Sequence, residues 1–305
     1  MSLVLNVLEQ GFLFSLVSIG VYITYKILDF PDMSVDGSFP LGAAVCAALL
    51  SRGMDPILSV FIALAAGAVA GFFTGILHVK LRIDSLLSGI LIMISLYSMN
   101  LRIMGKSNIP LFTFKNIFKE KELMIGNLNF APIIIILIFV IIAKLAIDLF
   151  LKTKRGFLLI ATGDNEQVVT SLGINSDNVK ILALMISNAL VALAGALTAQ
   201  YQGFSDVGMG TGTVVMGLAS VIIGVSVLKK VSFIKITTLA IFGAIVYKSV
   251  VAIALQVGLS PNDLKLVTAL IVIIALTINN KGLIFKRKKS MKGGAVLNVS
   301  SQESM

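Results

Sequence analysis

The sequence predicts an all-α, polytopic membrane protein with about nine transmembrane helices, within a range of about 8 to 10. The chain has 305 residues, of which 57% are hydrophobic and only 13% are charged. Its mean hydropathy of +0.99 is far above that of a soluble globular domain. Runs such as Pro132 to Ala143 are continuously apolar. They favour helices over a β-barrel, whose strands alternate apolar and polar residues.

Apolar segments follow one another along most of the chain. The candidate spans are Gly11 to Leu28, Ser38 to Leu50, Ile57 to Val79, Leu86 to Leu101, Ala131 to Leu151, Val179 to Gln200, Thr213 to Leu228, Ile236 to Val257 and Leu264 to Ile278. The second is short for a full crossing, so we expect a broken or tilted helix buried by its neighbours. The glycine-rich segment Tyr201 to Gly217 suits irregular backbone that re-enters the membrane beside the seventh span.

The polar gaps between the spans give the organisation of the chain. Residues 1–285 form the predicted transmembrane domain, with a long external loop at about 102–130 and a cytoplasmic loop at about 152–178. Residues 286–305 are a basic tail that we expect to be disordered. Because most Lys and Arg lie in gaps on one side, the positive-inside rule places the C-terminus in the cytoplasm. The side of the N-terminus depends on whether the second segment crosses or only re-enters.

The composition argues against several functional classes. The formal charge of +10 is explained by positive-inside sorting, so we expect no nucleic acid partner. The single cysteine, Cys46, excludes an intramolecular disulfide and a cysteine-based metal cluster. The single histidine, His78, has no second His or Cys at ligand spacing. We therefore expect no catalytic residue, no metal site and no cofactor bound by this chain.

An aspartate-rich loop between the first two spans is a candidate site. The segment LDFPDMSVDGSFPLG, Leu28 to Gly42, combines three aspartates with two prolines. An aspartate at membrane depth costs about a few kcal/mol unless it faces water or a partner, and a helix that begins there offers free N–H groups to a solute. The candidate pathway residues are Asp29, Asp32, Ser34, Asp36, Gly37 and Ser38. An ordinary cytoplasmic turn with a helix cap is the alternative.

The third span carries a GxxxGxxxG pattern formed by Gly67, Gly71 and Gly75. Small residues at every fourth position let another helix approach to backbone contact in lipid. We therefore expect these glycines to serve helix packing, within the chain or between subunits, and not to form a chemical site.

The polar stretch Lys154 to Asn178 separates two long apolar runs. A membrane chain interrupted in this way presents a short element to a soluble partner. Asp164 or Asn165 can cap a helix from Glu166 to Ser171, and Gly173 can end it. A rigid helix held between two spans can transmit a displacement into the membrane.

Three segments resemble the permease subunits of bacterial ABC importers of the branched-chain amino acid and ribose type. They are ILDFPDMSVDGSFPLGAAV, GFLLIATGDNEQVVTSLGIN and MGLASVIIGVSVLKK, in the family's order over nearly the whole chain. The first looks most similar to the tryptophan/tyrosine-type permease subgroup. The sequence departs from the family pattern at Leu172, where a small residue is usual, and after Gly224, where Lys229 and Lys230 stand where glycines are usual.

The resemblance implies a coupling helix that sits in a groove of an ATPase. The matching positions are Gly156, Gly163, Asp164, Asn165, Glu166 and Gly173. The resemblance also implies partners: ABC ATPase subunits, which carry ATP and Mg, and an external substrate-binding lipoprotein. It further implies a pore formed by two permease chains, as a homodimer or a related pair. The implied location is the bacterial plasma (inner) membrane. The expected solute is an amino acid, aromatic by the subgroup, while sugars, nucleosides and branched-chain amino acids stay open.

The alternative function is an ion-coupled secondary transporter or a channel, which needs no ATPase. Ion coupling usually requires carboxylates inside spans, and the candidates are Asp148, one turn from Lys144, and the aspartate-rich loop. The scarcity of charged residues in the spans disfavours this alternative. An intramembrane enzyme is disfavoured more strongly, because no nucleophile, base and metal ligands converge.

Overall fold

The structure is a computed structural model that describes residues 2–118, 124–125, 128–228, 235–260, 263, 266–273 and 277. The helices are α1 (Ser2–Val21), the π-helix η1 (Tyr22–Ile27), α2 (Val35–Ser51), α3 (Pro56–Val79), α4 (Ser85–Met104), α5 (Ala131–Leu151), α6 (Lys154–Asp164), α7 (Glu166–Ser171), α8 (Ser176–Gln202), α9 (Thr213–Leu228) and α10 (Ile236–Gln256). Two short antiparallel pairs join β1 (Asn108–Pro110) to β4 (Phe204–Asp206) and β2 (Met124–Ile125) to β3 (Leu128–Asn129).

Within the described residues, 6 helical segments are long and apolar enough to cross a membrane. They are Leu3–Ile27, Pro56–Val79, Ser85–Met104, Ala131–Leu151, Ser176–Gln202 and Thr237–Gln256. The class of a polytopic helical membrane protein is thus confirmed. The count of about nine spans stays a prediction. Helices α2 and α9 are shorter apolar helices, and the ninth predicted span lies partly outside the described residues.

The predicted short second span corresponds to α2, which has 17 residues and is buried along most of them. It is one continuous helix, although Pro40 lies inside it. The expected break lies ahead of α2 instead, at residues 28–34, where the chain leaves η1 and runs without regular structure. Pro31 falls in this segment, and a proline disfavours helical backbone at the residue before it and lacks an N–H group to continue a helix.

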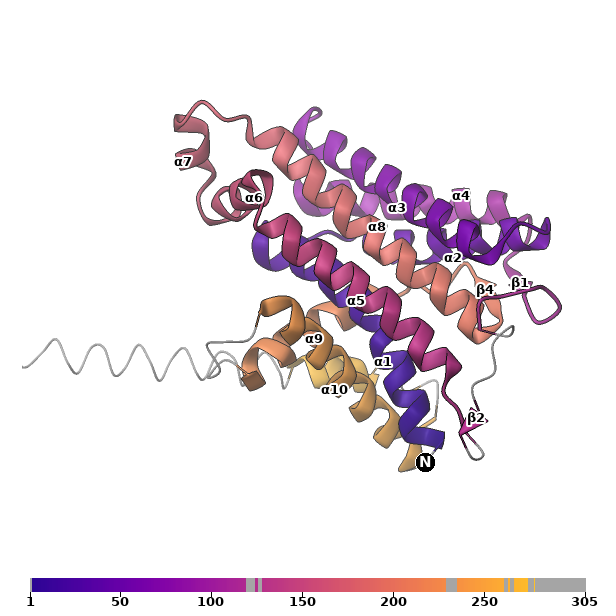
Figure 1. Cartoon of the computed structure of the whole chain (residues 1–305). Helices are drawn as coiled ribbons and strands as arrows, with labels where there is room; N and C mark the ends of the chain where they lie inside the picture. The colour runs from indigo at the N-terminus through magenta and orange to yellow at the C-terminus, as the bar shows by residue number, and fades with distance from the viewer. Residues whose placement is uncertain are drawn as a thin grey trace, which may run out of the picture.

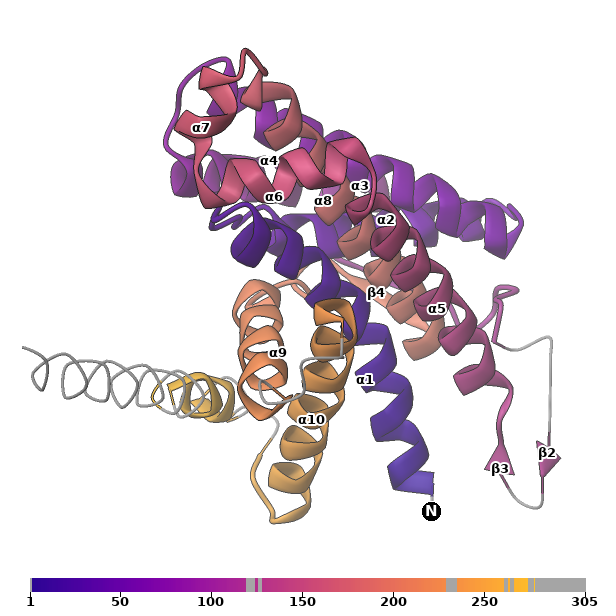
Figure 2. The same cartoon turned by 60° about the vertical axis from the view of Figure 1, so that its left-hand side comes forward.

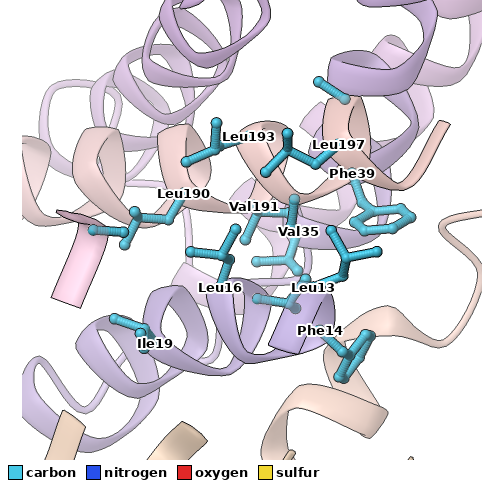
Figure 3. Packing of buried hydrophobic residues seen from close by; sticks show 14 of the residues in the cluster. Leu13, Phe14, Leu16, Ile19, Val35, Phe39, Leu190, Val191, Leu193 and Leu197 are labelled. Atoms are coloured by element: carbon cyan, nitrogen blue, oxygen red, sulfur yellow. The ribbon is translucent and has the colours of Figure 1, made fainter. Parts of the chain in front are cut away.

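Helix α8 lies at the centre of the bundle, packed against α2 and α3 and also against α1 (Figure 1). Figure 2 shows α9 and α10 gathered beside α1. In the core, Leu16 of α1 lies close to Val191 of α8, and Val35 of α2 joins the same buried group (Figure 3). Such a centre explains why α8 is the most buried of the 6 candidate spans, with 78% of its apolar window inside the protein.

The three glycines of α3 face α8. A Cβ atom on Gly67 would overlap the backbone oxygen of Asn188, and one on Gly71 would overlap that of Leu184. A Cβ atom on Gly75 would lie 3.0 Å from the Cα of Ile181. Helices α3 and α8 therefore meet at backbone distance inside this chain, which is the packing that small residues allow in lipid.

Replacing Gly71 with valine should destabilise the protein by about 1–3 kcal/mol or more, because the new side chain forces α3 away from Leu184. The measurement is the melting temperature of the purified protein in detergent. Ala65→Val is the matched control, since Ala65 lies on the exposed side of the same helix. Equal melting temperatures for the two variants would contradict the close packing of α3 on α8.

Candidate translocation cavity and coupling element

Asp32 lies in the break between η1 and α2 and is only 3% exposed. Its carboxylate accepts hydrogen bonds from the backbone N–H of Ser34 (2.9 Å), from the Ser34 hydroxyl (2.5 Å) and from Nδ2 of Asn188 on α8 (2.8 Å). A buried carboxylate is tolerated when its oxygens are hydrogen-bonded in this way. Asp32 therefore fastens the break to the central helix.

Asp36 lies in the first turn of α2 and connects it to the start of α9. One carboxylate oxygen accepts from the backbone N–H of Gly212 at 2.9 Å, and the other accepts from that of Val214 at 2.7 Å. The first N–H groups of a helix have no partner within the helix, and a carboxylate there also complements the helix dipole. The cap of α9 is thus supplied by a residue 176 positions away from Gly212.

A cavity of about 470 Å³ opens beside Asp36. Its lining comes from three elements that are far apart in the sequence. The residues are Met33, Asp36, Gly37 and Pro40 from the break and α2, Met93, Ile94, Tyr97, Ser98 and Asn100 from α4, and Val207, Gly208 and Thr211 from the loop before α9. The volume lies in the usual range for a small-molecule site.

The lining of this cavity is mainly apolar, with few polar groups. Asn100 is fully buried, and its Nδ2 donates to the backbone oxygen of Gly37 at 3.3 Å. Its Oδ1 has no hydrogen-bond partner among the residues that the structure describes. The apolar lining, which includes Tyr97 and Met93, suits a solute that has an apolar body.

The predicted pathway residues fall into separate environments. Asp36 and Gly37 line the cavity. Asp32 and Ser34 lie in the buried network with Asn188, and Ser38 is fully buried beneath the lining. Asp29 is exposed, with a positive φ of 54°.

The cavity residues on α4, the loop residues at 207–211 and Asn188 were not predicted from the sequence. Asn100 and Asn188 are isolated amides within apolar helices, and such polar residues inside spans were the available signal. The described part of the chain holds no group of three His, Cys, Asp or Glu residues that could bind a metal ion.

A coupling element, consisting of α6 and α7, protrudes between α5 and α8 at one end of the bundle (Figures 1 and 2). The Oδ1 atom of Asn165 accepts from the N–H groups of Gln167 (3.0 Å) and Val168 (3.3 Å), so Asn165 caps α7 and Asp164 does not. Gly173 follows with a φ of 75°, a left-handed conformation that glycine adopts most easily. The predicted helix from Glu166 to Ser171 is present, and α6, which was not predicted, precedes it.

The coupling element is joined to the spans at three places. A Cβ atom on Gly163 of α6 would overlap the backbone oxygen of Ile27, the last residue of η1. A Cβ atom on Gly156 would likewise overlap the backbone oxygen of Phe150 on α5. Glu166 forms an ion pair with Lys180 of α8 at 2.6 Å. These contacts join α6 and α7 to η1, which leads into the break before α2.

The ion pair of Glu166 also sets its protonation. The hydrogen bond from Lys180 holds the pKa of the Glu166 carboxyl below its ordinary value, and the Ser176 hydroxyl donates a second bond at 2.8 Å. A lowered pKa in the folded state means that this contribution to stability is present at neutral pH and is lost as the pH falls through the lowered pKa.

The outer surface of the coupling element is apolar at several points. Phe157 is 69% exposed, Val168 is 53% exposed and Leu172 is 71% exposed. These side chains lie on helices and a turn outside the candidate spans. Exposed apolar groups on a capped, ordered element are typical of a protein interaction site.

Asp148, the carboxylate considered for ion coupling, is engaged in contacts between helices. It accepts from Lys144 (2.9 Å), from Lys235 (3.0 Å) and from the Thr237 hydroxyl (2.6 Å). It thus holds α5 to the start of α10, and its two oxygens are already occupied.

An apolar helical bundle with a small-solute cavity, joined at one end to a protruding interaction element, defines a membrane transport subunit. The chain belongs to the family described as branched-chain amino acid transport system permease components, whose model matches residues 3–277. The resemblance found in the sequence is thereby confirmed.

Several relatives carry transport names. The chain is 50% identical over 287 residues to a tyrosine transport system permease protein of Clostridioides difficile, covering 94% of this chain and 95% of that protein. It is 32% identical over 281 residues to a protein of Rickettsia prowazekii, covering 91% and 98%. It is 32% identical over 197 residues to the autoinducer 2 import system permease protein LsrC of Yersinia enterocolitica, covering 63% and 52%. No solved structure matches the chain significantly.

Proposed function

We propose that this chain is the membrane-spanning permease subunit of an ATP-binding-cassette importer and forms the pathway for a small solute, an amino acid. The observation that carries the proposal is the coupling element, which exposes apolar side chains outside the spans and packs through Gly163 on Ile27. Family membership supports the same function. ATP and Mg would be bound by the partner ATPase, and this chain would hydrolyse nothing.

The proposed mechanism follows the contacts between the coupling element and the cavity. An ATPase subunit that binds the exposed side chains of Val168 and Leu172 would displace α6 and α7 when the ATPase changes conformation. The contact of Gly163 with Ile27 passes this displacement to the break, where Asp32 is fixed to α8. Met33 follows Asp32 directly and lines the cavity, so a shift of the break changes the shape of the solute pathway.

An aromatic amino acid is the solute that we propose. Its support is the 50% identity to the tyrosine transport system permease protein and the lining of the cavity by Met33, Met93 and Tyr97. Sulfur and aromatic side chains make favourable contacts with an aromatic ring.

The remaining partners and the location follow from the family and are part of the proposal. They are an external substrate-binding lipoprotein, a second permease chain in a homodimer, and the bacterial plasma membrane with the C-terminus in the cytoplasm. The basic tail 286–305 lies outside the described residues.

The test is native mass spectrometry of the chain, extracted gently from its own membrane. We expect an ATPase to leave with the wild-type chain, and the double variant Val168→Asp with Leu172→Asp to lose it, since charge on an apolar contact is costly. Val257→Asp is the matched control, because Val257 is 79% exposed and follows α10, so it is no part of the coupling element. Solute movement by the chain alone under an ion gradient, with no ATPase retained, would instead favour a secondary transporter.

A further inference from the structure

Lys248 is a cation within the apolar helix α10. Its Nζ atom lies 4.9 Å from the centre of the Phe14 ring on α1. Lys144, Lys180 and Lys235 each form an ion pair, whereas no carboxylate of the described residues lies within 4.0 Å of the Lys248 ammonium. Placing a charged side chain within a span costs free energy unless it contacts water or a partner, so we expect the Lys248 ammonium to bind a ligand.

Two cavities meet at Lys248. The first, of about 170 Å³, is lined by Gln10, Phe14, Thr198, Tyr201, Thr213 and Lys248 among others. The second, of about 490 Å³, is lined by Asn6, Gln10, Lys248 and Gln256 together with apolar residues of α1 and α10. Gln10 and Lys248 belong to both linings, so their polar groups lie where the two cavities adjoin. The α1 residues in these linings belong to its N-terminal two thirds, ahead of the end that continues into η1. Figure 2 shows the N-terminus of α1 on the opposite side of the bundle from α6 and α7.

The nearby acidic side chain does not neutralise Lys248. Glu9, although only 6% exposed, accepts a hydrogen bond of 2.7 Å from the Tyr201 hydroxyl. The Gln10 amide donates to Asn6 at 2.6 Å along the same helix. The cavities therefore present the Lys248 ammonium with the Gln10 amide beside it, while the Tyr201 and Thr198 hydroxyls donate elsewhere in the protein. A carboxylate is the ligand that an ammonium and an amide N–H would recognise.

We infer that Lys248, together with Gln10, forms a binding site for the carboxylate group of an amino-acid solute. The site lies on the side of the helical bundle opposite the coupling element. The inference rests on the proposed function of the chain as the permease subunit of an amino acid importer. The second cavity is wide enough to admit the solute, and the first, with Phe14, Met209 and Met216 in its lining, receives an apolar side chain. Among the described residues, no lysine or arginine lines the cavity beside Asp36, so the two places recognise different parts of a solute.

The test measures binding of L-tyrosine and of tyramine, which lacks the carboxylate, to the protein in phosphatidylcholine nanodiscs with the subunits that copurify with it. The wild type should bind tyrosine at least about tenfold more tightly than tyramine. Lys248→Met should remove this difference by weakening the binding of tyrosine alone, and Lys248→Arg should keep it. Lys26→Met is the matched control, because Lys26 is exposed on η1 near the coupling element. Melting temperatures verify that the variants fold.

Several results would overturn the inference. One is equal binding of the two compounds by the wild type, and another is a preference for tyrosine that survives Lys248→Met. A third is phosphatidylglycerol that stays bound to the wild type but not to Lys248→Met and is not displaced by tyrosine, which would assign the site to a lipid phosphate.

The proposed function fails by a different result. A wild-type chain that retains no ATPase but still shows tyrosine binding dependent on Lys248 would refute the importer and keep the carboxylate site. A wild-type chain that keeps its ATPase, combined with normal tyrosine binding by Lys248→Met, would support the importer and refute the carboxylate site.

Discussion

Replacing Asn188 with leucine is expected to lower the free energy of unfolding by about 3 kcal/mol or more. The Asn188 amide is the donor from α8 to the Asp32 carboxylate, at 2.8 Å, and Asp32 is 3% exposed. Leucine would leave one oxygen of a buried carboxylate facing an apolar group, and the break between η1 and α2 would lose its attachment to the central helix. The melting temperature in detergent and the yield of monodisperse protein measure the effect.

A swap of the two side chains is the matched control. The double variant Asp32→Asn with Asn188→Asp keeps one amide and one carboxylate at the same places, and the Ser34 hydroxyl, which lies 3.1 Å from Oδ1 of Asn188, can donate to the relocated carboxylate. We therefore expect the swap to recover most of the stability lost in Asn188→Leu. If Asn188→Leu melts at the wild-type temperature, Asp32 does not depend on α8, and the proposed route from the coupling element to the cavity loses its anchor.

Replacing Gly163 with valine is expected to uncouple ATP hydrolysis from uptake. The close contact of α6 with the backbone of Ile27 leaves no room for a Cβ atom, so α6 must move away from η1. Uptake should fall at least about tenfold, while hydrolysis by the partner ATPase continues. The measurement compares both rates in proteoliposomes that contain the chain with its copurifying subunits. A variant with wild-type uptake would show that this contact does not transmit the movement.

Thr170→Val serves as the control for the coupling element. Thr170 is exposed on α7, and its hydroxyl bonds only to backbone oxygens of Glu166 and Gln167 in the same helix. Valine has nearly the shape of threonine, so the element keeps its surface and its contacts with η1. We expect hydrolysis and uptake to stay coupled in this variant. Loss of coupling in both variants would indicate that any change in the element is harmful, and not the Gly163 contact in particular.

Part of the candidate site could be predicted from local sequence. The cap at Asn165 and the turn at Gly173 depend on neighbours within a few residues, so the helix between them was predicted from residue types. Helix α6 was not predicted. Its residues, Lys154 to Asp164, mix charged and apolar side chains over about three turns, without a clear residue pattern that ends a helix. The packing of α6 depends on the contact between Gly163 and the backbone of Ile27, which belongs to η1 and is distant in the sequence.

The sequence by itself predicted the class of this protein and the approximate positions of its long apolar helices, although not α6, because hydropathy, proline and capping residues act over short distances. Only the tertiary structure decided what each polar residue does. Asp32 and Asp36 are close neighbours in the sequence, yet one is fixed to Asn188 of α8 and the other caps α9. Lipid-facing and core-facing residues of a span are equally apolar, so hydropathy cannot tell which face of α4 lines a cavity or which side of α10 places Lys248 against α1.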